Sequence, residues 1–185
     1  MLDDKMNLHF KKADASHQAL IFEWLNEPHM MEFWDNSQEH KDDIQNFIEG
    51  KKQHYFYGTT QYWVGYLDNE PFCFLLSDII EADQDLSDIQ KKYLSKQGHT
   101  IAIDFGIGNK QLLGKGLASP TLAAFVNFYY QAVDNKADTF FIDPNQNNPR
   151  AKHVYGKAGF VWVGDYEAKN GAFDQETMLL MVKKI

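Results

Sequence analysis

The chain has 185 residues, of which 44% are hydrophobic and 15% aromatic, so it can bury a sizeable core and is not intrinsically disordered. Its net charge of −8 disfavours nucleic-acid binding and suits a cationic small-molecule ligand. The single cysteine, Cys73, excludes an intrachain disulfide, and its apolar neighbours favour a buried thiol over a nucleophile. With no leader pattern at the N-terminus and no membrane-spanning run, we expect a cytoplasmic protein.

The first elements predicted from the hydrophobic pattern are a strand and two short helices. The strand covers residues 6–12, and Asp14 is a suitable N-cap for the helix that follows, which Asn26-Glu27-Pro28 ends. We expect residues 29–34 to form an aromatic-rich connection and residues 41–49 to form the second helix.

A hairpin comes next, with strands over residues 61–67 and 71–76 and a tight turn at Asp68-Asn69-Glu70. The stretch 79–95 is polar and contains neither glycine nor proline before its end, so part of it can be helical. Alternating hydrophobicity predicts a further strand over residues 99–107.

In the last third, a helix is predicted over residues 117–133 and a short strand over residues 139–142. Asn148-Pro149 begins another helix, which Gly159 ends. The chain closes with strands over residues 160–166 and 177–182, joined by a turn at Asn170-Gly171. This order predicts one domain over residues 1–185, of α+β class with a central mixed sheet flanked by helices.

A glycine-rich turn precedes the helix at residue 117 and has the sequence QLLGKGL from Gln111. Its spacing fits neither a P-loop nor a dinucleotide-binding fingerprint. It does fit [QR]-x-x-G-x-[GA] at every position, and a turn of this kind before a helix gathers backbone N–H groups around an anion such as a pyrophosphate. The alternative is an ordinary glycine turn with Lys115 in solvent.

The second half of the chain favours the pyrophosphate interpretation. NPRAKHVYGKAGF, from Asn148 to Phe160, matches an N-x-R-A-x-x-x-Y-x-K-x-G-F helix, and together with the glycine turn it resembles the GNAT acyltransferases. The resemblance extends to the aminoglycoside 6′-N-acetyltransferase group through EWLNEPH, EFW, an Ile-Asp pair before LGKGL, and Asp-Pro before Asn148. It implies the GNAT fold and acetyl-CoA as the acyl donor, without a metal. The implied coenzyme contacts are Ile107, Gln111, Leu112, Leu113, Gly114, Lys115, Gly116, Leu117, Ala118, Asn148, Ala151, Tyr155 and Lys157.

Two side chains are candidates for the chemistry of direct acetyl transfer. Asp104 lies in an apolar strand, where burial would raise its pKa as a general base requires, and the resemblance places the catalytic aspartate at the same position. The resemblance also places Tyr155 near the coenzyme sulfur, where a phenol can protonate the leaving thiolate. The alternatives are a solvent-facing strand aspartate and a tyrosine packed on the sheet.

The acceptor site is expected to contain Asp143, which by resemblance binds a second amine, with Phe33 and Trp34 as aromatic walls. Asp143 can instead form an Asp-Pro turn, and the two aromatic residues can instead pack in the core. The acidic residues between 81 and 88 can attract a polycation or simply be solvated. The seven histidines lack the spacing of metal ligands.

These observations predict an acetyl-CoA-dependent N-acetyltransferase whose partner is a small cationic amine of the aminoglycoside type. Other acceptors stay open, namely a siderophore hydroxylamine, a polyamine, an amino acid or a protein N-terminus. A non-catalytic acyl-CoA-binding domain is the alternative from another functional class. The sequence is compatible with a monomer or a homodimer.

Overall fold

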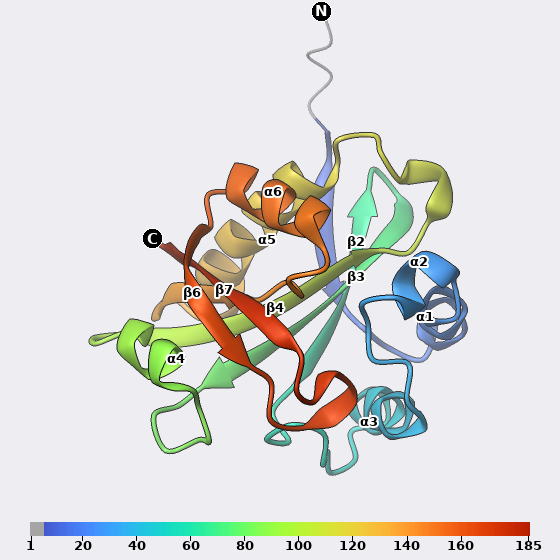
Figure 1. The fold of residues 1–185 in the computed structure, drawn as a ribbon. Coiled ribbons are helices and arrows are strands. Elements are labelled where there is room, and N and C mark those ends of the chain that lie inside the picture. Colours follow the sequence, from blue (N-terminus) through green and yellow to red (C-terminus); the bar gives the residue numbers. More distant parts are fainter. Residues whose placement is uncertain (1–5) are drawn as a thin grey trace, which may run out of the picture.

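A seven-stranded sheet of order β1-β2-β3-β4-β5-β7-β6 forms the centre of the computed structural model, which describes residues 6–185 (Figure 1). Residues 1–5, part of the N-terminal stretch considered above for a leader, lie outside the described residues. β4 and β5 run parallel, and the other neighbouring strands are antiparallel. The predicted mixed sheet is confirmed. Its strands are β1 (Leu8–Lys12), β2 (Gln61–Leu67), β3 (Glu70–Ile80), β4 (His99–Ile107), β5 (Ala137–Ile142), β6 (Val161–Glu167) and β7 (Thr177–Lys184).

The helices cover both faces of this sheet. They are α1 (Gln18–Leu25), α2 (Pro28–Met31), α3 (Gln38–Ile48), α4 (Asp88–Tyr93), α5 (Ala118–Phe128) and α6 (Pro149–Lys157), with short turns η1 (Lys110–Leu112), η2 (Tyr129–Val133) and η3 (Gly171–Phe173). α1 to α3 lie at one end of the sheet and α4 at the other (Figure 1). None of the helices within residues 6–185 is long and apolar enough to cross a membrane.

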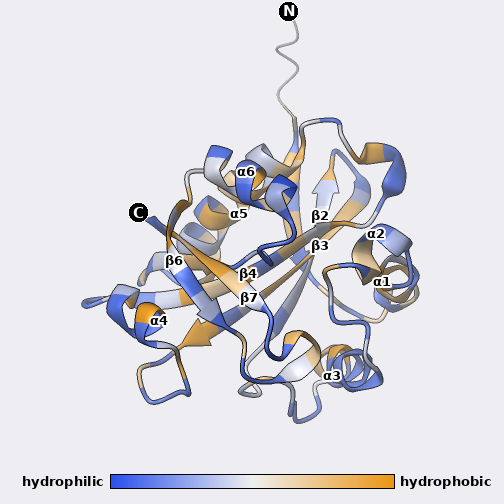
Figure 2. Ribbon diagram, viewed as in Figure 1, coloured by the Kyte–Doolittle hydropathy of each residue, from blue (hydrophilic) through white to orange (hydrophobic). Residues whose placement is uncertain are grey.

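The core has two main layers because successive residues of a strand point to opposite faces. On one face, residues such as Trp63, Leu75 and Ile103 pack against α5 and the end of α6. On the other face, Tyr62 and Phe74 pack against α1, α2 and α3. A smaller cluster joins α4 to β6 and β7. Hydrophobic residues accordingly concentrate along strands such as β3 and β7 (Figure 2).

Several predicted boundaries agree with the structure. The strands over residues 61–67 and 99–107 have the predicted limits. α5 and η2 together span the predicted helix to its predicted end. They bury the four residues expected to face inward, namely Leu122, Phe125 and Val126 on α5 and Tyr129 on η2. Asn148 caps α6 through a hydrogen bond from the Ala151 amide to its side-chain oxygen (3.1 Å).

The start of the first helix was predicted wrongly. Asp14 is not its N-cap, because its carboxylate accepts hydrogen bonds from the Ser16 backbone and hydroxyl at 2.9 and 2.6 Å, which closes a local turn. α1 therefore begins only at Gln18, and its N-cap position, His17, makes no side-chain capping bond. The predicted connection over residues 29–34 also contains a helix, because Pro28 stops α1 and opens α2.

Two further elements are longer than predicted. α3 begins at Gln38 because the Ser37 hydroxyl accepts a hydrogen bond from the His40 amide, an N-cap that the sequence interpretation overlooked. β3 continues past Leu76 to Ile80, so Asp78 lies within a strand. α4 confirms that the stretch 79–95 is partly helical.

Two glycines at the end of β4 allow α1 and α2 to approach the sheet closely. A Cβ at Gly108 would lie 2.1 Å from the indole of buried Trp24, and one at Gly106 would lie 2.7 Å from Met30 and 2.8 Å from Trp34. These glycines therefore serve helix–sheet packing. They also explain why a G-x-G pair occurs here without a complete dinucleotide fingerprint.

We predict that Gly108→Ala lowers the free energy of unfolding by about 1–3 kcal/mol, because the added methyl group must displace Trp24. Gly156→Ala is the matched control, since a Cβ there meets no atom within 4 Å and alanine should stabilise the helix interior by up to about 1 kcal/mol. Urea denaturation measures both. Equal stability of Gly108→Ala and the parent protein would contradict this account.

Candidate active site

The parallel strands β4 and β5 separate at the point where the candidate catalytic residues lie. Their pairing ends at Ala102 and Phe141. Asp104 and Asp143 each follow two residues later, so they continue the same face of the sheet, side by side across the opening. Both side chains are half-buried and keep some contact with solvent, as groups that meet a substrate must. The fold thus brings together two residues that are 39 positions apart in the chain.

The two carboxyl groups influence each other's protonation. Burial, followed by the charges of Asp143 and Asp78, raises the pKa of Asp104 well above its usual value. Burial also raises the pKa of Asp143, and a hydrogen bond from Tyr166 partly offsets that effect. Within residues 6–185, no lysine or arginine forms an ion pair with either carboxylate. A base with a raised pKa and no cationic partner is suited to accept a proton from an amine.

Asp143 is held by a contact that the sequence did not reveal. The Tyr166 hydroxyl, on β6, donates a hydrogen bond to one Asp143 oxygen. β6 and β5 are separated by β7 in the sheet, so only the folded topology brings this phenol to the carboxylate. The bond orients Asp143 and leaves its other oxygen able to accept from a ligand.

Tyr155 lies on α6 and packs against the core cluster beneath α5. Burial raises the pKa of its hydroxyl, and the charges of Asp104 and Asp143 raise it further. The phenol and the two carboxylates therefore lie within electrostatic reach of one another. A phenol with a raised pKa keeps its proton at neutral pH and can act only as a donor in an acid–base step.

The glycine-rich turn has the backbone of an anion-binding loop. Gly114 and Gly116 have φ angles of +72° and +76°, a conformation that favours glycine. Among the hydrogen bonds of residues 6–185, none is donated by the amides of Gly114, Lys115 or Gly116. The turn leads directly into α5, so these amides lie at the positive end of a helix of 11 residues.

Arg150 adds a positive charge to this turn. Its Nη2 atom lies 3.9 Å from the position that a Cβ on Gly114 would occupy. Arg150 is the only arginine in the chain, and the sequence interpretation treated it as part of a motif without a role of its own. A guanidinium beside unpaired amides fits a phosphate group. The turn and Arg150 therefore have the chemistry that a phosphate or pyrophosphate group requires.

The other predicted coenzyme contacts surround this turn and α6. The side-chain oxygen of Asn148 is used by the helix cap, which leaves its amide nitrogen available to donate. The carbonyl of Ile107 accepts a hydrogen bond from His29 Nε2 at 2.8 Å, which requires the proton to be on that nitrogen. The remaining positions lie between η1 and the start of α5 or on α6; they are Gln111, Leu112, Leu113, Leu117, Ala118, Ala151 and Lys157.

The EWLNEPH segment, which carries part of the family resemblance, also fixes the end of β4. Its tryptophan, Trp24, packs on Gly108, and its histidine, His29, binds the last carbonyl of β4. Both contacts fix the end of the strand that carries Asp104. Trp34 packs in the same layer, with its ring 5.2 Å from that of Phe74, and Phe33 is half-buried in the turn after α2. Their role as acceptor walls stays a prediction.

The loop before β2 lies on the face of the sheet that α1 to α3 cover, and the carboxylate of Asp43 anchors it. Asp43, on α3, accepts hydrogen bonds from the amides of His54 and Tyr55, from the Gln53 side chain and from the Tyr62 hydroxyl, at 2.9–3.1 Å. By contrast, the acidic residues predicted either to attract a polycation or to be solvated are all exposed; they are Glu81, Asp83, Asp85 and Asp88.

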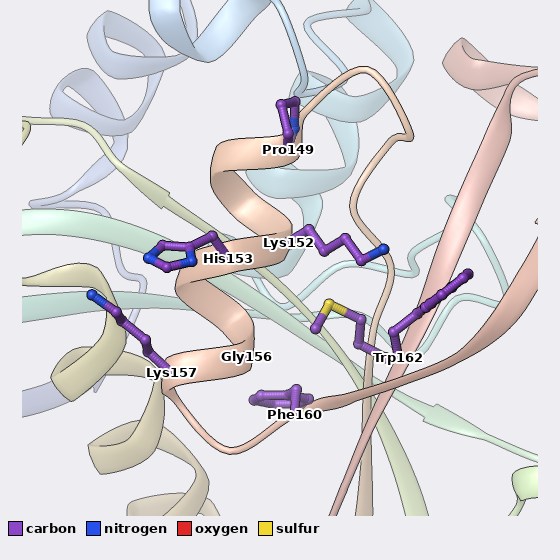
Figure 3. Close-up of a pocket in the computed structure, with 8 residues that line it drawn as sticks. Pro149, Lys152, His153, Gly156, Lys157, Phe160 and Trp162 are labelled. Atoms are coloured by element: carbon purple, nitrogen blue, oxygen red, sulfur yellow. The ribbon is translucent and has the colours of Figure 1, made fainter.

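A cavity of about 550 Å³ lies between α6, β6 and β7 (Figure 3). Lys152 extends towards Trp162, 3.8 Å from its ring, while His153 and Lys157 point to the other side of the helix (Figure 3). Neither Asp104 nor Asp143 lines it.

Among residues 6–185, no group of three or more histidine, cysteine or acidic side chains is arranged to hold a metal ion.

Comparisons with known proteins identify the family of the chain. The family model described as an acetyltransferase (GNAT) domain matches residues 14–168. No curated protein matches the sequence.

Several solved structures share the fold. An aminoglycoside N(6′)-acetyltransferase from Legionella pneumophila is 23% identical, with a TM-score of 0.75 over 98% of this chain and 94% of that one. The aminoglycoside acetyltransferase AAC(6′)-Ib, in complex with coenzyme A and kanamycin, is 23% identical, with a TM-score of 0.73 over 96% and 95%. A chimera of the Vibrio cholerae spermidine N-acetyltransferase SpeG is 15% identical, with a TM-score of 0.66 over 96% and 95%. At these identities the likeness establishes the fold.

The family model covers most of the chain, and the sheet, the glycine turn and the α6 motif lie within the matched residues. The chain belongs to the GNAT family of acetyltransferases and is an acyl-CoA-dependent N-acetyltransferase.

Proposed function

We propose that this protein transfers an acetyl group from acetyl-CoA to a primary amine of a cationic small molecule, with the 6′-amine of an aminoglycoside as the acceptor. The observation that carries the proposal is the pair Asp104 and Asp143 at the opening between β4 and β5, without a cationic protein partner among residues 6–185. Such a pair complements a molecule with several ammonium groups. The aminoglycoside acetyltransferases with the same fold support the choice of acceptor.

The donor would be held by groups already described. When bound, acetyl-CoA supplies an acetyl group activated as a thioester. The amides of Gly114 and Gly116, together with the Arg150 guanidinium, would bind its pyrophosphate. The Asn148 amide nitrogen is free of the helix cap and would donate to the pantetheine arm. Coenzyme A in the neighbouring AAC(6′)-Ib structures supports this donor.

The chain's own residues then perform the proton transfers. Asp104 takes the proton from the acceptor amine, because its raised pKa brings it closer to the pKa of the amine than an ordinary aspartate would be. Asp143, oriented by Tyr166, holds a second ammonium group of the acceptor. Tyr155 donates its phenolic proton to the sulfur that leaves. Cys73 takes no part, since it is fully buried and burial raises the pKa of its thiol.

A polyamine is the second candidate acceptor. The same unpaired carboxylates would bind a linear polycation, and the fold is shared with a spermidine N-acetyltransferase. The two classes differ in shape, because an aminoglycoside presents rigid rings that need aromatic or flat surfaces. The acceptor therefore has to be established by turnover.

The proposal is tested by measuring thiol release from acetyl-CoA with a panel of amines. We expect turnover with kanamycin-like aminoglycosides and a far lower kcat/KM with spermidine, lysine, a hydroxylysine analogue or a peptide N-terminus. Mass spectrometry of the product, followed by NMR, identifies the acetylated nitrogen. Preference for spermidine would replace the aminoglycoside proposal with the polyamine one. Tight acetyl-CoA binding without turnover of any amine would indicate a binding domain.

Replacing the proposed base is expected to abolish most of the activity while leaving the fold intact. Asp104→Asn should lower kcat by about 10²–10⁴-fold, because the amide cannot accept the amine proton. Asp138→Asn is the matched control, since Asp138 lies near the opposite end of β5 and hydrogen-bonds to Thr139 at 2.9 Å. The control should keep its activity. Near-normal kcat in Asp104→Asn would refute the assignment.

Removing the arginine beside the glycine turn is expected to weaken donor binding selectively. Arg150→Gln should raise the KM for acetyl-CoA about tenfold or more with little change in kcat, because a charge-assisted phosphate contact is lost. Lys152→Gln is the control, since its ammonium lies over Trp162 on another side of α6. Steady-state kinetics with varied acetyl-CoA measures both variants. An equal rise in KM in both would show a general charge effect instead.

A further inference from the structure

A third carboxylate lies beside the proposed base, on the next strand of the sheet. In the pairing of β3 with β4, Asp78 is opposite Ala102 and Leu76 is opposite Asp104. Alternate residues share a face, so Asp78 and Asp104 are diagonal neighbours on one face, at a typical Cα separation of about 7–8 Å. The residue opposite Asp78 is an alanine, whose side chain is only a methyl group.

Asp78 is held in place by hydroxyl groups. The Thr60 hydroxyl donates a hydrogen bond to Asp78 Oδ1 at 2.9 Å, and the Thr59 hydroxyl lies 3.5 Å from the same oxygen. Asp78 is 5% exposed, so it has almost no access to an acceptor. Burial raises its pKa to about 6, and the threonine hydrogen bonds limit that rise. At neutral pH and above, Asp78 is therefore mostly ionised.

The ionisable groups around these two residues are acids and phenols. Asp104 is influenced by Asp143 and Asp78, and it in turn raises the pKa values of Tyr55, Tyr155 and Tyr166. Asp78 is influenced by Asp43 on α3 and raises the pKa values of Tyr57, Tyr62 and Tyr129. Among residues 6–185, no ion pair joins Asp78 to a lysine or arginine. The negative charge of Asp78 therefore acts on Asp104 without being neutralised.

We propose that Asp78 is a positioning residue for the transfer reaction: its buried carboxylate, fixed by Thr60, keeps Asp104 able to take a proton from the acceptor amine. The inference rests on the proposed function, in which Asp104 is the base. A negative charge nearby makes deprotonation of Asp104 less favourable and so makes its carboxylate a stronger base. Asp78 itself touches neither substrate, because it is buried and its Oδ1 accepts a hydrogen bond from Thr60.

The first test is a direct titration that does not depend on activity. In protein labelled with ¹³C at aspartate carboxyl groups, the Asp104 signal is assigned by its loss in Asp104→Asn. Asp78→Asn keeps an oxygen that can accept from Thr60 but removes the charge. We expect the pKa of Asp104 to fall by about one pH unit in this variant. Asp138→Asn, at the far end of β5, should leave it unchanged.

The second test uses the pH dependence of kcat/KM for the acceptor. A general base must be deprotonated, so activity falls as the pH decreases through its pKa; a raised pKa places this acidic limb well above the ordinary aspartate value of about 3.9. Asp78→Asn should move the limb to lower pH by the amount that the titration gives. The acceptor KM near the pH optimum should stay the same, because Asp78 does not contact the acceptor.

Variants of Thr60 test the same link without altering a carboxyl group. Thr60→Val removes the hydrogen bond that stabilises ionised Asp78, so Asp78 stays protonated to higher pH and the pKa of Asp104 should again fall. Thr60→Ser retains the hydroxyl and should behave like the parent protein. This pair decides the question even if Asp78→Asn does not fold. A Thr60→Ser variant that matches Thr60→Val would indicate a packing effect and overturn the proposal.

The outcomes separate this inference from the proposed function. Unchanged Asp104 titration in both Asp78→Asn and Thr60→Val overturns the inference, even where aminoglycoside acetylation is confirmed. A lower pKa of Asp104 together with an unchanged acidic limb of the kcat/KM profile also overturns the inference. Asp78 would then affect the titration of Asp104 without acting on the reaction. A raised acceptor KM with no movement of the limb would make Asp78 a binding residue instead. Absence of turnover with every amine refutes the proposed function, while the titration still decides whether Asp78 sets the basicity of Asp104.

Discussion

The site depends on the place where two parallel strands stop pairing. β4 and β5 separate after Ala102 and Phe141, which leaves backbone groups that need other partners. The fold supplies a partner for one of them, because His29 Nε2 donates a hydrogen bond to the Ile107 carbonyl at 2.8 Å. An opening stabilised in this way can admit a substrate between two carboxylates without loosening the rest of the sheet.

The arrangement of carboxylates around this opening lowers the stability of the fold. Asp78, Asp104 and Asp143 lie on one face of three neighbouring strands, and two of them raise the pKa of the third. Burying charges without cations is unfavourable, so a protein under selection for stability alone would place apolar residues here. In the proposed function, a cationic acceptor would remove that penalty when it binds. The same arrangement would then supply both the basicity of Asp104 and a preference for a polycation.

Much of this structure could be predicted from the sequence because short-range patterns determine it. The alternation in residues 99–107 gave β4, the Asn-Pro pair gave the start of α6, and the glycine spacing gave a turn whose φ angles require glycine. Asp78 was missed because a Ser-Asp pair after an apolar run resembles the end of a strand, and only the pairing with β4 shows that β3 continues. The contacts of Tyr166 and Arg150 depend on tertiary packing, which no local pattern encodes.

Asp43 has a consequence for how this face of the molecule moves. Loops commonly fray on their own, yet the segment before β2 donates three hydrogen bonds to the Asp43 carboxylate on α3, which also accepts one from the Tyr62 hydroxyl. Breaking one of these bonds leaves the others in place, so local opening of this segment requires the loss of several hydrogen bonds together. The segment and α3 are therefore joined into one cooperative unit on this face of the sheet.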